Sequence, residues 1–159
     1  MLIRTAQAED AAQIAAIWNL EITLGVSTFN SVAKPVEEIS ELIDQRGAAL
    51  IVAEAKHDIL GFATWGQFRR GAGYRHSFEH TLHLREIARG KGIGRALMRA
   101  TEAGARRDGA HALVAGIAGE NRAGVVFHEK MGFEQVGRLP EVGRKFDRWM
   151  DLVLMLKLL

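Results

Sequence analysis

The chain of 159 residues contains no cysteine, which excludes both a disulfide framework and a thiol nucleophile. It contains only two prolines, Pro35 and Pro140, so no proline-rich linker divides it. Its most apolar run, residues 152–159, is interrupted by Lys157 and is far too short to cross a bilayer. The first residues lack the basic segment and long apolar stretch of a secretory signal. We therefore expect a cytoplasmic protein with no membrane association.

A large excess of charge of one sign is also missing, because 21 basic and 19 acidic residues leave a formal net charge of +2. Proteins that bind nucleic acid without sequence preference carry a stronger basic excess, so that class is not expected. The basic residues are nevertheless grouped locally, at 69–75, 85–95 and 106–107. Such clusters in a nearly neutral chain favour one small anionic ligand, although solvated helix faces explain part of them.

Periodic patterns predict a mixed α/β fold in one domain that spans residues 1–159. Apolar residues make up 48% and charged residues 25%, as in ordinary globular proteins, and no internal boundary is visible. The order of expected elements is βααβββαβαββ, which favours a mixed sheet with helices on both faces. Expected strands cover residues 2–5, 49–55, 59–67, 78–84, 113–117, 133–138 and 149–156, and expected helices begin near Asp10, Pro35, Ile93 and Arg122, with Asp10 as an N-cap.

A glycine-rich segment, residues 89–94, lies between an expected strand and an expected helix. The first N–H groups of a helix have no partners within it, and the helix dipole adds positive potential there. Glycines remove the Cβ atoms that keep a phosphate away from the backbone. The segment is not a Walker A loop, and it lacks the third glycine and the acidic residue of a dinucleotide fingerprint. By itself it is explained equally well as a tight turn.

The block formed by Arg89, Gly92 and Gly94 with the amphipathic helix after it resembles the pyrophosphate-binding loop of the GNAT superfamily of N-acetyltransferases. The resemblance extends along nearly the whole chain, through 28–29 (TF), 61–63 (GFA), Asn121, 126–133 (VFHEKMGF) and 143–151 (GRKFDRWMD). The last segment is similar to the phosphinothricin acetyltransferase branch, whose members acetylate phosphinothricin, methionine sulfoximine and related amino acids. The resemblance implies a GNAT fold, a mostly antiparallel mixed sheet of about seven strands flanked by about four helices.

The resemblance also implies how acetyl-CoA, the co-substrate, is bound. Its pantetheine arm is expected to pair with the strand at Leu82, His83 and Leu84, and Asn121 is expected to bond to the same region. The pyrophosphate is expected to lie on Arg89, Gly90, Lys91, Gly92, Ile93, Gly94 and Arg95. No metal is expected, because His80 and His83 are three residues apart on a strand and point to opposite faces.

Glu79 and His128 are the candidate catalytic residues. Acetyl transfer to an amine needs a base for the ammonium proton, a stabilised oxyanion and a hydrogen-bonded or protonated leaving thiolate. Taken alone, Glu79 is equally explained by an ion pair with nearby arginines, but the resemblance assigns it as the base, acting directly or through water. His128 stands where many GNAT members have a tyrosine, and is either a general acid or a residue that shapes the pocket. Without cysteine, direct transfer in a ternary complex is favoured over a covalent intermediate.

The acceptor is expected to bind on the side of the strand that carries Glu79 and Thr81. Arginine suits bidentate capture of a carboxylate, and the loop before Glu79 contains three arginines, each explained about as well by solvent exposure. By resemblance, Phe29 and Tyr74 line the acceptor pocket. The expected acceptor-binding residues are Phe29, Arg69, Arg70, Tyr74, Arg75 and Thr81. The spacing of the basic residues at 69–73 and the histidine at 83 depart from the branch, which leaves the acceptor open.

Two other functions remain open. Acetylation of a protein N-terminus or a lysine requires a groove open enough for a peptide. A non-catalytic regulator would bind acyl-CoA without turnover, and the presence of both Glu79 and His128 argues against it. Members of the branch form homodimers, so a homodimer is expected here, with the apolar strand 153–159 either covering the interface or buried within one chain.

Overall fold

The computed structural model describes all 159 residues and follows the predicted order of elements. The seven strands are β1 (Leu2–Thr5), β2 (Leu50–Ala55), β3 (Asp58–Gln67), β4 (Ser77–Leu84), β5 (Ala112–Ala118), β6 (Glu134–Lys145) and β7 (Arg148–Leu158). The four α-helices are α1 (Ala11–Thr23), α2 (Val36–Arg46), α3 (Ile93–Arg107) and α4 (Arg122–Lys130), and short 3-10 turns occur at η1 (Ala8–Asp10), η2 (Gly47–Ala49), η3 (Ala72–Tyr74) and η4 (Glu86–Ala88). The predicted mixed α/β fold is confirmed.

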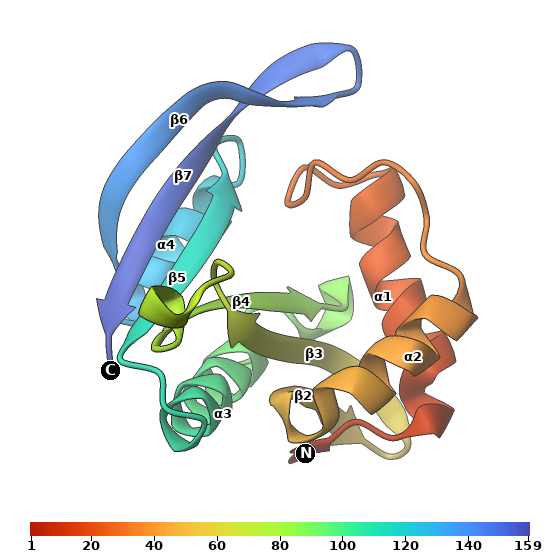
Figure 1. Ribbon diagram of the computed structural model, residues 1–159. Helices are drawn as coiled ribbons and strands as arrows, with labels where there is room; N and C mark the ends of the chain where they lie inside the picture. Colours follow the sequence, from red (N-terminus) through yellow and green to blue (C-terminus); the bar gives the residue numbers. More distant parts are fainter.

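The strands form one open sheet in the order β1-β2-β3-β4-β5-β7-β6. Every neighbouring pair is antiparallel except β4 and β5, which run parallel. These two strands pair only where Ser77–Glu79 faces Ala112–Val114, and then they diverge, so the sheet opens between them (Figure 1). The second half of β4, from residue 80 to 84, therefore has a free edge on the β5 side.

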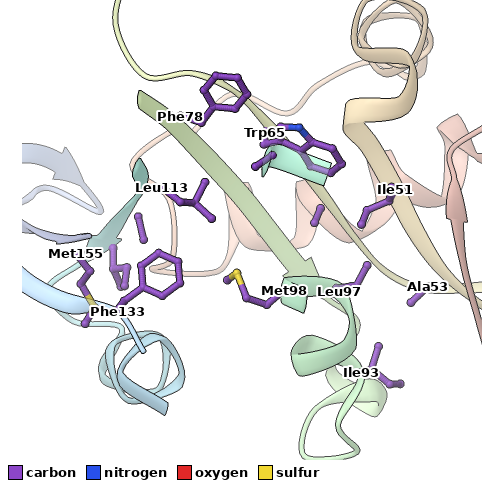
Figure 2. Close-up of a cluster of buried hydrophobic side chains, with 14 of the residues drawn as sticks. Ile51, Ala53, Trp65, Phe78, Ile93, Leu97, Met98, Leu113, Phe133 and Met155 are labelled. Carbon is purple, nitrogen blue, oxygen red and sulfur yellow. The ribbon is translucent and has the colours of Figure 1, made fainter. Parts of the chain in front are cut away.

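The two faces of the sheet are covered by different helices, because side chains alternate along each strand. Leu50 and Val52 of β2 pack in a core with α1 and α2, whereas Ile51 and Ala53 of the same strand pack in the core under α3. Figure 2 shows this second core, in which Leu97 and Met98 of α3 lie among side chains from the strands. Helix α4 packs on the same face as α3, against β5 and β6.

Close approach of α3 to the sheet depends on one small residue. A Cβ atom at Gly104 would collide with the indole ring of Trp65, so glycine allows this large ring to lie flat under the helix. Trp65 is 2% exposed, and its Nε1–H donates to Asp108 Oδ2 at 2.7 Å. The only polar atom of the ring is therefore satisfied, as burial requires.

Two local expectations need correction. The sixth strand was expected over 133–138, but β6 runs to Lys145 and continues through a two-residue turn at Phe146 and Asp147, both with positive φ. Two bulges interrupt its alternation, one of them around Pro140, which hides the strand from pattern analysis. Asp10 precedes α1 as expected, but its carboxylate does not cap the helix and instead pairs with Arg4 at 2.7 Å.

No helix of the structure combines the length and the apolar composition that crossing a membrane would require.

Candidate active site

The divergence of β4 and β5 opens a cleft with a volume of about 1240 Å³. Its walls are formed by residues 79–84 of β4, residues 115–118 of β5, the end of α1 with the segment 24–30 after it, and one side of α4. Most of the residues predicted for the site line this cleft, namely Phe29, Glu79, Thr81, Leu82, His83, Leu84, Arg89, Gly90, Gly92, Gly94, Arg95, Asn121 and His128. The topology of the sheet therefore brings together segments that are far apart in the sequence.

The glycine turn before α3 presents bare backbone to the cleft. Gly90 and Gly92 have φ values of 73° and 80°, and a Cβ atom at either position would meet no atom within 4 Å. Gly92 precedes the first helical residue and contributes no side-chain cap, so the first N–H groups of α3 keep their capacity to donate. These features fit a pyrophosphate group.

Other residues of the turn have different roles. Gly94 allows close packing, because a Cβ there would lie 3.2 Å from Leu84 and 3.4 Å from Phe127. Lys91 is exposed and does not line the cleft. The Ile93 side chain is 6% exposed and belongs to the core under α3, so only its backbone is available to a ligand.

Arg89 is already bound to a carboxylate that sequence analysis did not single out. Its Nη2 donates to Glu21 Oε1 at 2.5 Å, and the Ser27 hydroxyl donates to Glu21 Oε2 at 2.6 Å. Burial by itself would raise the pKa of Glu21, but the Ser27 hydroxyl and the Arg89 guanidinium lower it below its usual value. Glu21 therefore connects the end of α1 to the glycine turn.

Glu79 lies where β4 and β5 part, paired with Gly66 of β3 and Val114 of β5. Its side chain is exposed to the cleft and forms no ion pair or hydrogen bond, so the expected alternative of an arginine partner is absent. Gly116 on β5 leaves room for the carboxylate, since a Cβ there would lie 3.4 Å from Glu79 Oε1. The surrounding protein removes water and raises the pKa of this carboxyl. A free carboxylate with a raised pKa is suited to accept a proton.

The loop before β4 lies apart from the cleft. Arg69, Arg70, Tyr74 and Arg75 are all exposed, and none lines the cleft wall. The Arg69 guanidinium instead lies over the Tyr74 ring, 5.8 Å from its centroid. A role for this loop in acceptor binding therefore stays a prediction, whereas Phe29 and Thr81 do line the cleft.

The segment 24–30 is held in place by Lys145, which comes from the far end of the β6–β7 hairpin. Its ammonium donates to three backbone carbonyl oxygens, those of Glu21 at 3.1 Å, Gly25 at 2.7 Å and Thr28 at 2.9 Å. The residue is 4% exposed, and burial lowers the pKa of its ammonium while the charge of Glu21 opposes the shift. Sequence analysis placed Lys145 in a recognised segment without a role, because no local signal reveals contacts between residues 117 to 124 positions apart.

The same hairpin also supports Phe29. A Cβ atom at Gly143 would collide with the Phe29 ring, so the ring lies directly on the backbone of β6. One wall of the cleft is thus formed by the end of α1 and the segment after it, which the β6–β7 hairpin supports.

His83 occupies the place of an aromatic residue on β4. Its ring packs against those of Trp18 and Phe62, with centroid distances of 6.0 and 5.7 Å. Burial lowers its pKa to about 4, so the ring is neutral at neutral pH. Although histidine at this position departs from the branch pattern, the position still holds an uncharged planar ring. No three histidine, aspartate or glutamate side chains come together as metal ligands.

Two residues of the α4 region face the free edge of β4 across the cleft. The Asn121 Oδ1 accepts from the Gly124 N–H at 2.9 Å and caps α4, which leaves its amide NH₂ to donate elsewhere. One His128 ring nitrogen, Nδ1, lies 2.7 Å from the Gly124 carbonyl oxygen, and the other, Nε2, lies 3.0 Å from Nε2 of His80. Burial lowers the pKa of His128. Sequence analysis considered His80 only as a metal ligand.

Comparison with known proteins agrees with this geometry. Residues 3–154 match the family model described as acetyltransferase (GNAT) domain. The chain is 34% identical over 157 residues to the L-methionine sulfoximine/L-methionine sulfone acetyltransferase of Pseudomonas paraeruginosa, which covers 96% of this chain and 91% of that protein.

Two solved structures are similar over nearly the whole fold. The ribosomal-protein-alanine N-acetyltransferase from Brucella melitensis is 36% identical, with a TM-score of 0.95 over 100% of both chains. A GNAT superfamily phosphinothricin acetyltransferase from Sinorhizobium meliloti, solved in complex with AcCoA, is 28% identical, with a TM-score of 0.93 over 99% of this chain and 88% of that one.

Proposed function

This chain belongs to the GNAT acetyltransferase family, and we propose that it moves an acetyl group from acetyl-CoA to the amine of a small amino-acid-like acceptor. Methionine sulfoximine, methionine sulfone and phosphinothricin are the proposed acceptors, by similarity to the relatives named for them. The observation that carries the proposal is Glu79, an unpartnered carboxylate at the point where β4 and β5 part. A glycine turn suited to a pyrophosphate lines the same cleft.

Acetyl-CoA supplies the activated acetyl thioester, and the chain supplies its binding surface. We assign the pyrophosphate to the bare backbone of Gly90 and Gly92, with Arg89 and Arg95 at the same side of the cleft. The free edge of β4 at residues 80–84 offers unpaired backbone groups to the amides of the pantetheine arm. The NH₂ group of Asn121 faces the same arm from α4.

Glu79 takes the proton that the acceptor must lose before its nitrogen can attack. An ammonium has no lone pair, so a base within reach, directly or through one water, is required. Because loss of surrounding water raises the pKa of Glu79, its carboxylate is a better proton acceptor than an ordinary surface glutamate. Phe29 and Thr81 line the cleft where the acceptor would lie.

The proposal is tested by measuring the release of free CoA during incubation with acetyl-CoA and each acceptor. A thiol-reactive dye is unusually clean here, because the chain contains no cysteine and every reactive thiol is released CoA. Release that depends on methionine sulfoximine, methionine sulfone or phosphinothricin is the expected result. Release that is the same without any acceptor would reflect hydrolysis and would contradict the proposal.

Acetylation of a peptide amine is the second candidate, favoured by the similarity to a ribosomal-protein-alanine N-acetyltransferase. The two candidates are separated by comparing methionine sulfone with a short peptide that begins with alanine, at equal concentrations. We expect a higher kcat/KM for the free amino acid, and the reverse order would favour the peptide. Calorimetric uptake of CoA with no turnover of any amine would instead favour a non-catalytic regulator.

We further propose that the chain acts as a homodimer in the cytoplasm, where its co-substrate is available. Val153 and Met155 of β7 are buried within the single chain, so the strand 153–159 is not free to cover a partner along its length. The β6–β7 hairpin carries a group of exposed apolar side chains, at Val136, Leu139, Val142, Phe146 and Trp149. Sedimentation of the wild type and of Trp149→Glu tests this, with the variant expected to be monomeric.

A further inference from the structure

The pair of histidines at the free edge of β4 forms a defined hydrogen-bond chain. His80 Nε2 lies 3.0 Å from His128 Nε2, and His128 Nδ1 lies 2.7 Å from the Gly124 carbonyl oxygen. His80 is 8% exposed, and its Nδ1 is buried without a hydrogen-bond partner. Phe133 packs against both rings, with centroid distances of 5.6 Å to His80 and 5.1 Å to His128.

The chemistry of the partners decides where the protons lie. A carbonyl oxygen can only accept, so His128 Nδ1 must carry a hydrogen and donate it to Gly124. In a neutral ring, Nε2 of His128 is then an acceptor, and the 3.0 Å contact is a hydrogen bond only if His80 Nε2 carries a hydrogen. The opposite assignment would bring the lone pairs of the two Nε2 atoms together at this distance.

Both rings are held neutral. Burial, and to a lesser extent the neighbouring His128, lowers the pKa of His80 to about 3, while the backbone of Val114 opposes the shift. The pKa of His128 is lowered by burial, with only the Gly124 carbonyl opposing, and no charged side chain contributes to it. The aromatic rings of His80, Phe127 and Phe133 pack against the His128 ring.

From this geometry we infer that His80 is a positioning residue that locks His128 as a neutral Nδ1–H tautomer with no N–H available to the cleft. The inference rests on the proposed acetyl transfer only for its catalytic meaning. With Nδ1 bonded to Gly124 and Nε2 bonded to His80, His128 cannot donate a proton to the leaving thiolate in this arrangement. His128 therefore forms part of the cleft wall as an uncharged ring in a fixed orientation. Of the two roles considered for it, this favours shaping the pocket over general acid catalysis.

The test is the tautomeric state of the two rings in the intact wild-type protein, measured by long-range proton–nitrogen correlation NMR. Spectra of His80→Phe and His128→Phe assign the two rings among the 6 histidines. We expect His128 as the Nδ1–H tautomer, with a pKa below 6.5, and His80 as the Nε2–H tautomer, without titration between pH 5 and 8. An Nε2–H signal for His128, or its protonation near pH 6.5, would overturn the inference whether or not the protein acetylates any amine.

Variants separate the hydrogen bond from packing. In His80→Phe the donor is lost and Nε2 of His128 becomes free. The pKa of His128 is therefore expected to rise by about one unit or more. Its protonation should then add a new pH-dependent step to the profile of kcat/KM. His80→Gln, whose amide can donate from a similar position, is expected to restore the wild-type titration. Phe133→Leu alters the packing on both rings without removing the donor, and the same shift in this variant as in His80→Phe would refute the role of the hydrogen bond.

Discussion

Glu79 shows how one side chain can be set apart for chemistry by its surroundings. Some charged residues near the cleft have partners, as Glu21 has Arg89 and Lys145 has three carbonyl oxygens. Glu79 has none, and Gly116 keeps the space beside its carboxylate open. A carboxylate that lies in a cleft without a partner and with a raised pKa is a candidate for a functional role.

Glu79→Gln is expected to lower kcat by about 100-fold or more, because the amide cannot accept the acceptor's proton. The dissociation constant for acetyl-CoA, measured by calorimetry, should remain within about twofold. Glu41→Gln, an exposed change on α2, is the matched control and should leave both values unaltered. Undiminished turnover in Glu79→Gln would remove this residue from the mechanism.

The raised pKa of Glu79 also predicts a pH dependence with a definite sign. The ionised form is the base, so kcat/KM should fall as pH decreases through the pKa of this carboxyl, above the ordinary glutamate value of 4.5. Glu79→Gln should lose this acidic limb and retain only the dependence due to the acceptor amine. The profile is measured with a fixed acceptor over the range in which the fold is intact.

The glycine turn and α3 form one element, in which the turn presents bare backbone to the cleft and the helix anchors it in the core. Gly90 and Gly92 adopt φ values that L side chains rarely adopt, and both face open space. Ile93, the first residue of α3, is buried in the core and fixes the turn against the sheet. The backbone N–H groups are thereby oriented before a ligand arrives.

Gly92→Ala is expected to weaken acetyl-CoA binding by about tenfold, since positive φ costs an alanine about 1–2 kcal/mol and its Cβ would project toward the phosphate site. The dissociation constant is measured by calorimetry and the stability by thermal melting. Gly137→Ala on β6 is the control, because a Cβ there meets no atom within 4 Å and the backbone φ is not positive. Equal effects of the two substitutions on binding would contradict the assignment of the turn.

The β6–β7 hairpin is the second element that shapes the cleft, because its Lys145 holds the segment 24–30 in place. Lys145→Met would leave three carbonyl oxygens at the end of α1 without their shared donor. Each buried polar group left unpaired costs about 1–3 kcal/mol, so we expect lower thermal stability together with a raised KM for the acceptor.

Hydrogen exchange gives a local readout of the same substitution. Amides in the segment 24–30 should exchange faster in Lys145→Met than in the wild type, because the hairpin no longer holds this segment. Lys34→Met is the control, since Lys34 pairs only with Glu38 on the surface and with the face of Trp18. Protection of 24–30 that is unchanged in Lys145→Met would show that the clamp does not hold the cleft wall.

For the molecule as a whole, buried neutral histidines predict how stability depends on pH. Burial lowers the pKa of His80 to about 3 and that of His83 to about 4, from 6.5 in an unfolded chain. The unfolded state therefore binds more protons below pH 6.5, and the folded state loses stability as pH falls toward 4. The ion pair with Arg4 lowers the pKa of Asp10. Asp10 therefore becomes protonated only at a pH below this window.

The expected loss at pH 5 relative to pH 7 is about 2 kcal/mol for each of these two histidines. Denaturant unfolding at the two pH values measures it. His83→Phe, which keeps a planar ring against Trp18 and Phe62, should reduce the difference by about half, whereas the exposed change His57→Asn should not alter it. A pH-independent free energy of unfolding across this range would contradict the buried, neutral state of the rings.

Sequence by itself determined the order of the elements and the position of the glycine turn before α3. Alternation and helical spacing act over a few residues, and they correctly placed Glu79, Thr81 and His83 on one face of β4. The recognised segments then indicated the family, which the family model confirms over residues 3–154. These features are local, so a linear pattern is enough to reveal them.

Only the tertiary structure decided which of these residues meet. The parting of β4 and β5 after Glu79 created the cleft, the histidine pair arose across 48 positions of sequence, and Lys145 reached its carbonyl partners across more than 100. The same packing left the arginines of the loop 68–76 outside the cleft, where their charge had suggested a role. Contacts between distant segments depend on how strands pair and helices pack, and that information is absent from the spacing of residues along one segment.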